Sequence, residues 1–132
     1  MAVIPEKVLN LLQDPEAVKV LVTCSAGGRP QAIVDGTIIS PTPESLAVGE
    51  ILMKKSAKNL KANKKCSFVV VKGTESYEIN CRYVEDQKSG PLFDAMKAKC
   101  DAMKLPLSAV KVFTVCCVCD ESAGPNAGKK IA

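Results

Sequence analysis

Hydrophobic positions along the chain change their spacing several times, and each change marks an expected element of secondary structure. Near the start, apolar residues follow the spacing of one helix face, which predicts a short amphipathic helix from Pro5 to Gln13. Apolar, β-branched runs separated by turn residues then predict six strands. These expected strands span residues 18–24, 31–40, 46–52, 66–71, 76–84 and 110–119.

Two further helices are expected between the later strands. Residues 53–60 carry apolar side chains at i, i+4 and i+7, the spacing of one helix face. Gly90 and Pro91 are typical of a helix start. Residues 122–132 are rich in Gly, Pro, Asn and Lys and are expected to form a mobile tail. The helix that begins near Pro91 is expected to bury an apolar stripe made of Leu92, Met96, Cys100 and Met103.

Hairpins joined by tight turns, with helices between the later strands, are typical of an α+β domain with a mostly antiparallel sheet. A small barrel capped by helices fits this order of elements best. The chain has 132 residues, no internal repeat and no linker, so residues 1–132 are expected to form one domain. The pattern leaves the order of the strands open.

The positive charge is concentrated in one segment. The formal net charge is +4, yet residues 54–65 hold six lysines and no acidic residue, so the remainder of the chain is slightly acidic. A local patch of this size suits a small anionic ligand better than a long nucleic-acid track. The chain has no Trp, two Tyr and three Phe, which form no stacking array. We therefore expect no nucleic-acid partner.

The composition also indicates where the protein is located in the cell and limits the chemistry that its side chains can perform. No apolar run approaches the roughly 20 residues that span a membrane, and the start lacks the apolar region of a signal peptide. Seven cysteines without an export signal indicate a reducing compartment, so we expect a cytoplasmic protein with no membrane partner. Histidine is absent, which removes the most common general base. If the protein is an enzyme, its chemistry is expected to come from a bound cofactor and not from catalytic side chains.

The expected helix start within residues 53–60 offers groups that bind phosphate. Lys55, Ser56 and Asn59 lie three and four residues apart and share one helix face. A helix N-terminus adds free backbone N–H donors and a partial positive charge, which favour anions. Lysine-rich helices with a merely solvated face show the same pattern, so the segment alone leaves both interpretations open.

Two other features invite a functional interpretation. Cys116 and Cys119 have C-x-x-C spacing, but in a strand they point to opposite faces, and no second pair completes a zinc site. We predict that the cysteines are packing residues and that the chain has no metal site. Asp35 and Gly36 interrupt an apolar strand, and a bound ligand or a structural bulge explains this pair equally well.

The order of the elements, together with Met53-Lys54-Lys55-Ser56 and Asn59, resembles the FMN-binding split barrel of the pyridoxamine 5′-phosphate oxidase-like family. The similarity is greatest to the small FMN-binding proteins of that family and extends from Pro5 to Asp120. It implies a six-stranded split β-barrel with flanking helices. It also implies a homodimer with FMN sites at the subunit interface.

The resemblance implies which residues bind FMN. The phosphate would be held by Lys55, Ser56 and Asn59, with Lys54 adjacent. An inward-pointing Asp35 would place a negative charge near the flavin and lower its redox potential. The isoalloxazine ring would lie against the backbone of two segments, which consist of Val34, Asp35, Gly36 and Thr37, and of Glu50, Ile51, Leu52 and Met53.

The function implied by the resemblance is that of a flavoprotein. It would act as an FMN-dependent oxidoreductase or a small electron carrier, through electron or hydride transfer with an unknown redox partner. Oxidation of pyridoxamine phosphate itself is not expected, because the Arg-rich C-terminal region of that enzyme is not found. Two alternatives stay open: a non-catalytic barrel that binds haem or a deazaflavin, and a lysine-patch interaction domain that binds an acidic partner.

Overall fold

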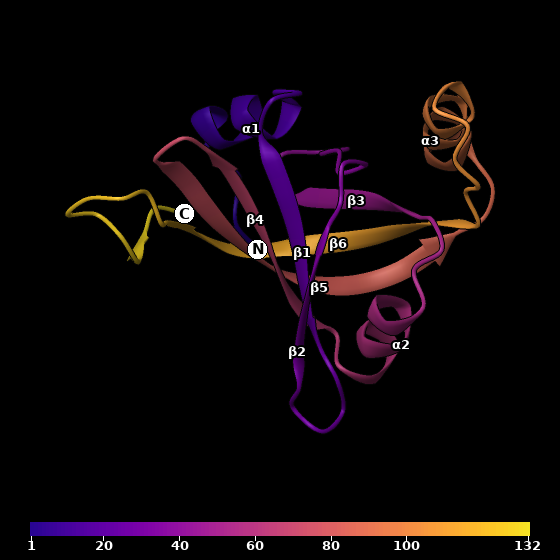
Figure 1. The fold of residues 1–132 in the computed structure, drawn as a ribbon, viewed down its shortest axis with the longest axis horizontal. Helices are drawn as coiled ribbons and strands as arrows, with labels where there is room; N and C mark the ends of the chain where they lie inside the picture. Colours follow the sequence, from indigo (N-terminus) through magenta and orange to yellow (C-terminus); the bar gives the residue numbers. More distant parts are fainter.

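The computed structural model describes all 132 residues and contains three helices and seven strands (Figure 1). None of the helices is both long and apolar enough to cross a lipid bilayer. The helices are α1 (Glu6–Gln13), α2 (Lys55–Ala62) and α3 (Pro91–Ala102). The strands are β1 (Val18–Cys24), β2 (Pro30–Val34), β3 (Ser45–Glu50), β4 (Lys65–Lys72), β5 (Glu75–Gln87), β6 (Ala109–Asp120) and β7 (Lys129–Lys130).

All strands pair antiparallel in one open sheet with the order β2-β1-β4-β5-β6-β3, and β7 pairs with the C-terminal end of β6. β2 and β3 are therefore the two ends of the path. The prediction of an α+β domain with an antiparallel sheet is confirmed. The prediction of six strands is wrong, because residues of the expected tail form β7.

The C-terminal segment 122–132 lies against β6. Its strand β7 pairs with Cys119 and Asp120, and the side chains of Ile131 and Ala132 pack against the main core. These contacts explain why a segment rich in Gly and Lys joins the sheet. The mobility expected for the segment stays a prediction.

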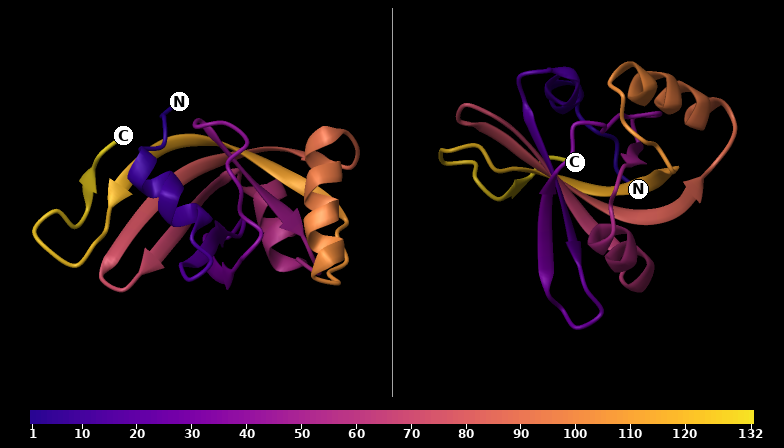
Figure 2. Two further views of the ribbon diagram at one scale, coloured as in Figure 1. Left: turned by 90° about the horizontal axis from the view of Figure 1, so that it is seen from above. Right: turned by 45° about the vertical axis from the view of Figure 1, so that its right-hand side comes forward.

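The long strands β5 and β6 bend the sheet into an open half-barrel (Figure 2). Register shifts between Asn80 and Cys81 and between Tyr83 and Glu85 mark irregularities in their pairing. Such bulges increase the local twist and bend the strand that carries them. The bend lets one sheet surround a core that a flat sheet would leave open.

The main core lies between α1 and the sheet. The helical spacing of Val8, Leu11 and Leu12 places all three on the buried face of α1. Phe68 and Phe113 meet edge to face with 5.0 Å between ring centroids, an arrangement that stabilises aromatic pairs. A smaller cluster lies under α3 and consists of Ala47, Met96, Cys100 and Val110.

Two local predictions differ from the structure. The strand expected over residues 31–40 ends at Val34, because a turn at Gly36 and Thr37 follows Asp35. The following segment rejoins the sheet only through a bridge between Ile39 and Ala47. Met103, expected on the buried face of the last helix, is its C-cap and is 47% exposed.

Candidate functional site

Three adjoining pockets form one groove, which runs along β2, the loop between β3 and α2, and α2 itself. Its basic end is a cavity of about 600 Å³ between the β1–β2 turn and α2. This end shares Gln31 and Lys55 with a middle pocket. The middle pocket shares Ile33, Ile51 and Met53 with an inner pocket of about 230 Å³ at the end of β2. The groove therefore leads from a basic end to a smaller, largely apolar inner pocket.

The basic end of the groove is lined by Arg29, Lys55 and Lys58 and by no acidic residue. Figure 1 shows α2 beside the hairpin of β1 and β2, which contributes Arg29. No side chain caps the N-terminus of α2, and its first turn contains no acidic residue. Free N–H donors beside cations favour a phosphate group.

Ser56 and Asn59 are buried between α2 and the first hairpin. Asn59 Nδ2 donates to Thr23 Oγ1 at 3.0 Å and to Gln31 Oε1 at 3.4 Å. Ser56 Oγ donates to the same Gln31 oxygen at 3.3 Å. Both bonds to Gln31 are longer than ordinary hydrogen bonds, so the two donors can turn to a stronger acceptor such as a phosphate oxygen.

The three residues predicted to bind phosphate thus lie together, but they are not equally open. Lys55 is exposed, whereas Ser56 and Asn59 are buried together with Leu60. The sequence pattern placed the buried stripe on the opposite face, where Ala57 is only partly buried. The buried face differs from the predicted one because the polar face of α2 packs against the Thr23 hydroxyl and the Gln31 amide of the hairpin.

Asp35 forms part of the wall of the inner pocket and is 7% exposed. Its Oδ1 accepts hydrogen bonds from the backbone N–H of Thr37 at 2.9 Å and from the Thr37 hydroxyl at 2.6 Å. Its Oδ2 is buried and has no hydrogen-bond partner. Leaving a buried acceptor without a donor costs about 1–3 kcal/mol, and more for a charged group, so a ligand that supplies a donor would be stabilised here.

The loop between β3 and α2 forms the floor of the middle pocket. Leu52 in this loop has a φ of 53°, an uncommon value for a residue with a side chain, and is 81% exposed. Val34, at the end of β2, is 75% exposed. Two large apolar side chains therefore stand exposed at the groove: Leu52, beside Met53 and Lys54 in the loop, and Val34, at the end of β2.

Glu50 is the one predicted site residue that does not line the groove. Its carboxylate pairs with the Lys111 ammonium at 2.9 Å, and its backbone carbonyl accepts a hydrogen bond from Ser108. Lys111 is fully buried and also pairs with Asp86 at 2.9 Å. Glu50 therefore fixes the end of β3, from which the groove loop departs.

The ion-pair network around Lys111 includes Asp86 and Tyr83. Burial raises the pKa of Asp86, but hydrogen bonds from Tyr83 and Lys111 outweigh this effect and lower the pKa below its usual value. Burial and the hydrogen bond to Asp86 raise the pKa of Tyr83. Lys111 Nζ also lies 5.3 Å from the centroid of the Tyr83 ring. The network joins β3, β5 and β6 directly behind the groove loop.

All seven cysteines are free thiols. Cys66, Cys81 and Cys100 are buried, as predicted for packing residues. Cys116 is exposed, so the packing prediction is wrong for this residue. It lies on β6, where a shift of the pairing register changes which side chains face the core.

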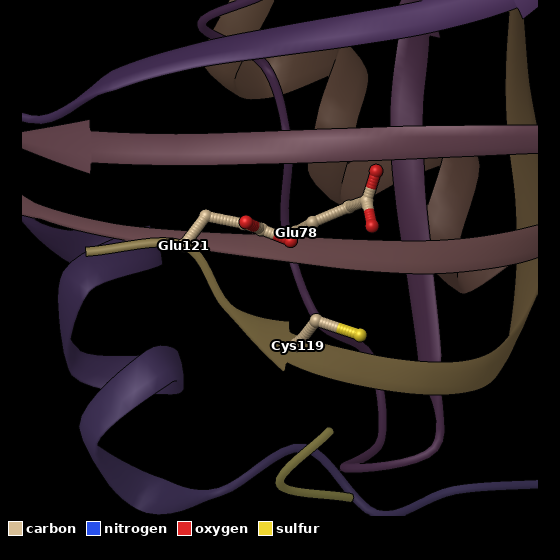
Figure 3. Close-up of side chains that lie close together, drawn as sticks. All are labelled: Glu78, Cys119 and Glu121. Atoms are coloured by element: carbon tan, nitrogen blue, oxygen red, sulfur yellow. The ribbon is translucent and has the colours of Figure 1, made fainter. Parts of the chain in front are cut away.

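Cys119 lies beside Glu78 and Glu121 on the sheet surface, as Figure 3 shows. The potential ligand atoms of these three residues lie within 4.8 Å of one another. Burial, together with Cys117 and Glu78, raises the pKa of the Cys119 thiol, whereas a metal ion binds the thiolate. Glu121 is exposed, and exposed acidic groups commonly lie close together without a bound ion, so the absence of a metal site stays a prediction.

Solved structures show which fold this chain has. An FMN-binding protein from Syntrophomonas wolfei superposes with a TM-score of 0.83 at 19% identity, over 91% of this chain and 87% of that chain. HupZ of Group A Streptococcus superposes with a TM-score of 0.81 at 19% identity, over 95% and 99%. A candidate pyridoxamine 5′-phosphate oxidase from Lactobacillus delbrueckii gives a TM-score of 0.72 at 19% identity, over 88% and 93%.

Two further matches carry other cofactors in their names. An F420 reductase superposes with a TM-score of 0.67 at 18% identity, over 87% of this chain and 98% of that chain. HutZ, a haem storage protein from Vibrio cholerae, gives a TM-score of 0.61 at 14% identity, over 86% and 89%. No protein-family model and no curated protein matches the chain. The resemblance to the split barrel is confirmed at the level of the fold.

Proposed function

We propose that this chain, which has the split-barrel fold, is an FMN-binding flavoprotein related to the pyridoxamine 5′-phosphate oxidase-like proteins. The groove carries this proposal, because it joins a cationic end to a largely apolar pocket whose wall includes the unpartnered Asp35. FMN has the same polarity, with a phosphate at one end and a planar heterocycle at the other. The shared fold of the FMN-binding protein from S. wolfei supports the assignment.

The residues of the basic end fit a phosphate. Lys55, Arg29 and Lys58 supply positive charge, and the uncapped N-terminus of α2 supplies backbone donors. Ser56 and Asn59 would exchange their long hydrogen bonds to Gln31 for bonds to phosphate oxygens. The site thus offers charge, directed donors and shape together.

The remainder of the groove fits a flat heterocycle. Ile33, Ile51 and Met53 provide apolar surface between the two ends and exclude water from the ring. Asp35 and Thr37 provide the polar edge of the inner pocket. When bound, FMN would supply electron or hydride transfer, so we propose an oxidoreductase or small electron carrier that needs no catalytic side chain.

We also propose that the protein forms a homodimer in which the partner subunit completes each groove. Val34 and Leu52 support this proposal, since both expose most of their apolar surface beside the site. Exposed apolar residues next to a ligand groove are typical of surfaces that another chain covers. The free thiols suit a cytoplasmic location, and the redox partner is unidentified.

Haem or a deazaflavin, bound without turnover, is the second candidate. The haem storage protein HutZ and the F420 reductase share the fold and favour this alternative. The basic end would accept the carboxylates of haem as well as a phosphate. A lysine-patch domain for an acidic protein partner has less support, because Ser56 and Asn59 are turned into the fold and not toward such a partner.

A visible absorption spectrum tests the proposal. The purified protein is mixed with FMN or with haemin, desalted and scanned. Bound FMN is expected to keep bands near ~375 and ~450 nm with the protein. Riboflavin, which lacks the phosphate, is the matched control and is expected to bind more weakly. Complete loss of FMN on desalting, together with retention of haemin, would reject the flavin assignment.

A further inference from the structure

We propose that Asp35 accepts a hydrogen bond from the N3–H of the flavin ring and thereby selects isoalloxazine-type rings over haem. This inference rests on the proposed function, because it concerns the same groove. Its basis is the Oδ2 atom of Asp35, a buried acceptor without a partner in a pocket that has room for part of a ring. A ligand that brings a donor to this atom satisfies it, and a ligand without one leaves it unpaired.

The orientation of the carboxylate is fixed by its neighbours. Oδ1 accepts both the backbone N–H and the hydroxyl of Thr37. The Thr37 hydroxyl oxygen accepts in turn from the backbone N–H of Gly49 at 2.9 Å, so its own proton is directed to Asp35. These bonds occupy Oδ1 and leave Oδ2 for the ligand. A preorganised acceptor of this kind binds a donor without first losing conformational entropy.

Oxidised isoalloxazine offers one ring N–H, at N3, between two carbonyl groups. A deazaflavin retains this N–H, so Asp35 does not separate the two kinds of flavin. Haem offers none, because its nitrogens bind the iron and its periphery carries alkyl, vinyl and carboxylate groups. Sites with buried polar groups discriminate strongly against ligands that leave those groups unpaired. Asp35 therefore disfavours haem in the inner pocket.

The variant Asp35→Asn reverses the hydrogen-bonding character of the pocket at nearly constant volume. Both Thr37 groups that face residue 35 are donors, so the amide oxygen must stay toward Thr37. The amide NH2 then takes the place of Oδ2. The pocket wall changes from an acceptor into a donor, which opposes the N3–H of the ring.

The test compares FMN with 3-methyl-FMN, which lacks the N3–H, for the native protein and for Asp35→Asn. Equilibrium dissociation constants are measured by quenching of flavin fluorescence. The native protein is expected to bind FMN roughly tenfold or more tightly than 3-methyl-FMN, the effect of a hydrogen bond to a charged group. In Asp35→Asn this preference should fall below about threefold. Asp101→Asn, an exposed residue of α3, is the matched control and should keep the native preference.

The outcomes separate the inference from the function on which it rests. If the native protein binds neither flavin, the proposed function fails. If it binds both equally, FMN binding stands and the role of Asp35 is overturned. The role of Asp35 is also overturned if methylation weakens binding equally in the native protein and in Asp35→Asn, since steric exclusion of the methyl group then explains the effect. Should Asp35→Asn fail to fold, Asp35→Ser takes its place and should likewise lose the preference.

Discussion

The backbone N–H of Gly49 donates to the hydroxyl of Thr37 at 2.9 Å, which ties β3 to the turn that follows β2. Because the same hydroxyl donates to Asp35, both segments beside the inner pocket belong to one hydrogen-bonded unit. All three residues are buried. The Thr37 hydroxyl therefore links the two segments that line the inner pocket.

Thr37→Val should lower both stability and FMN affinity. The change leaves the buried N–H of Gly49 without an acceptor and removes one donor from Asp35. The expected loss is about 1–3 kcal/mol in the free energy of unfolding. Urea unfolding of the protein measures it, with Thr74→Val in an exposed turn as the control. Equal stability of both variants would contradict the role of the Thr37 hydroxyl.

Lys55→Ala, Arg29→Ala and Ser56→Ala should each weaken FMN binding. Loss of one hydrogen bond to a charged phosphate should cost on the order of 1.5–3 kcal/mol of binding free energy. Titration calorimetry measures this change, and Lys61→Ala on the same helix is the control, because Lys61 does not line the groove. Riboflavin binding should not change in Lys55→Ala. Unchanged FMN affinity in all three variants would refute the phosphate site.

Asp35→Asn should raise the midpoint potential of bound FMN. The native carboxylate disfavours the anionic reduced flavin, and the amide removes that negative charge. A spectroelectrochemical titration of the native and variant proteins measures the shift, and it needs no substrate. A midpoint that stays the same or falls would show that the charge of Asp35 does not act on the ring.

Lys111→Met should destabilise the fold strongly. The substitution leaves the carboxylates of Glu50 and Asp86 without their buried counter-ion. Breaking a buried pair in this way costs about 3–5 kcal/mol. Thermal or urea unfolding measures the loss. The triple variant with Glu50→Gln and Asp86→Asn should recover a large part of it, and no recovery would indicate that packing of the lysine stem dominates.

The stability of the protein should fall as the pH becomes acidic. The pKa of Asp86 is lower in the folded protein than in the unfolded chain, so the unfolded chain binds the proton first. The contribution of Asp86 is therefore complete above its unfolded pKa of about 3.9 and is lost as the pH falls through the lower folded value. Urea midpoints at several pH values should show a shallower acid dependence in Asp86→Asn. Identical slopes would rule out this contribution.

Local patterns were sufficient for most elements of the fold. The β-branched run of β1 predicts the strand Val18–Cys24 with the same bounds, and Gly90 with Pro91 predicts the start of α3. The strand after the first turn was predicted too long, since apolar residues continue past Asp35 and Gly36. Hydrophobic runs locate strands, but they do not show where the backbone turns within a run.

The site could be predicted only where its residues are close in sequence. The groups at the start of α2 form a local pattern, so the sequence was sufficient to group Lys55, Ser56 and Asn59, and the structure places them together. Arg29 and Gln31 join them from a hairpin distant in sequence, and neither has a local signal. The burial of Lys111 has no local signal either, because a lysine within an apolar strand is buried only when other strands supply carboxylates to pair with it.

β2 pairs with one neighbour only, so one side of its backbone is open along the strand that also lines the groove. An open strand edge is a template on which another polypeptide can add a strand and start aggregation. Pro30 removes one donor from this edge, and the residues after it have no such protection. A ligand seated beside β2 would cover part of the edge. Preparations depleted of the cofactor should therefore precipitate sooner on storage than those kept saturated with it.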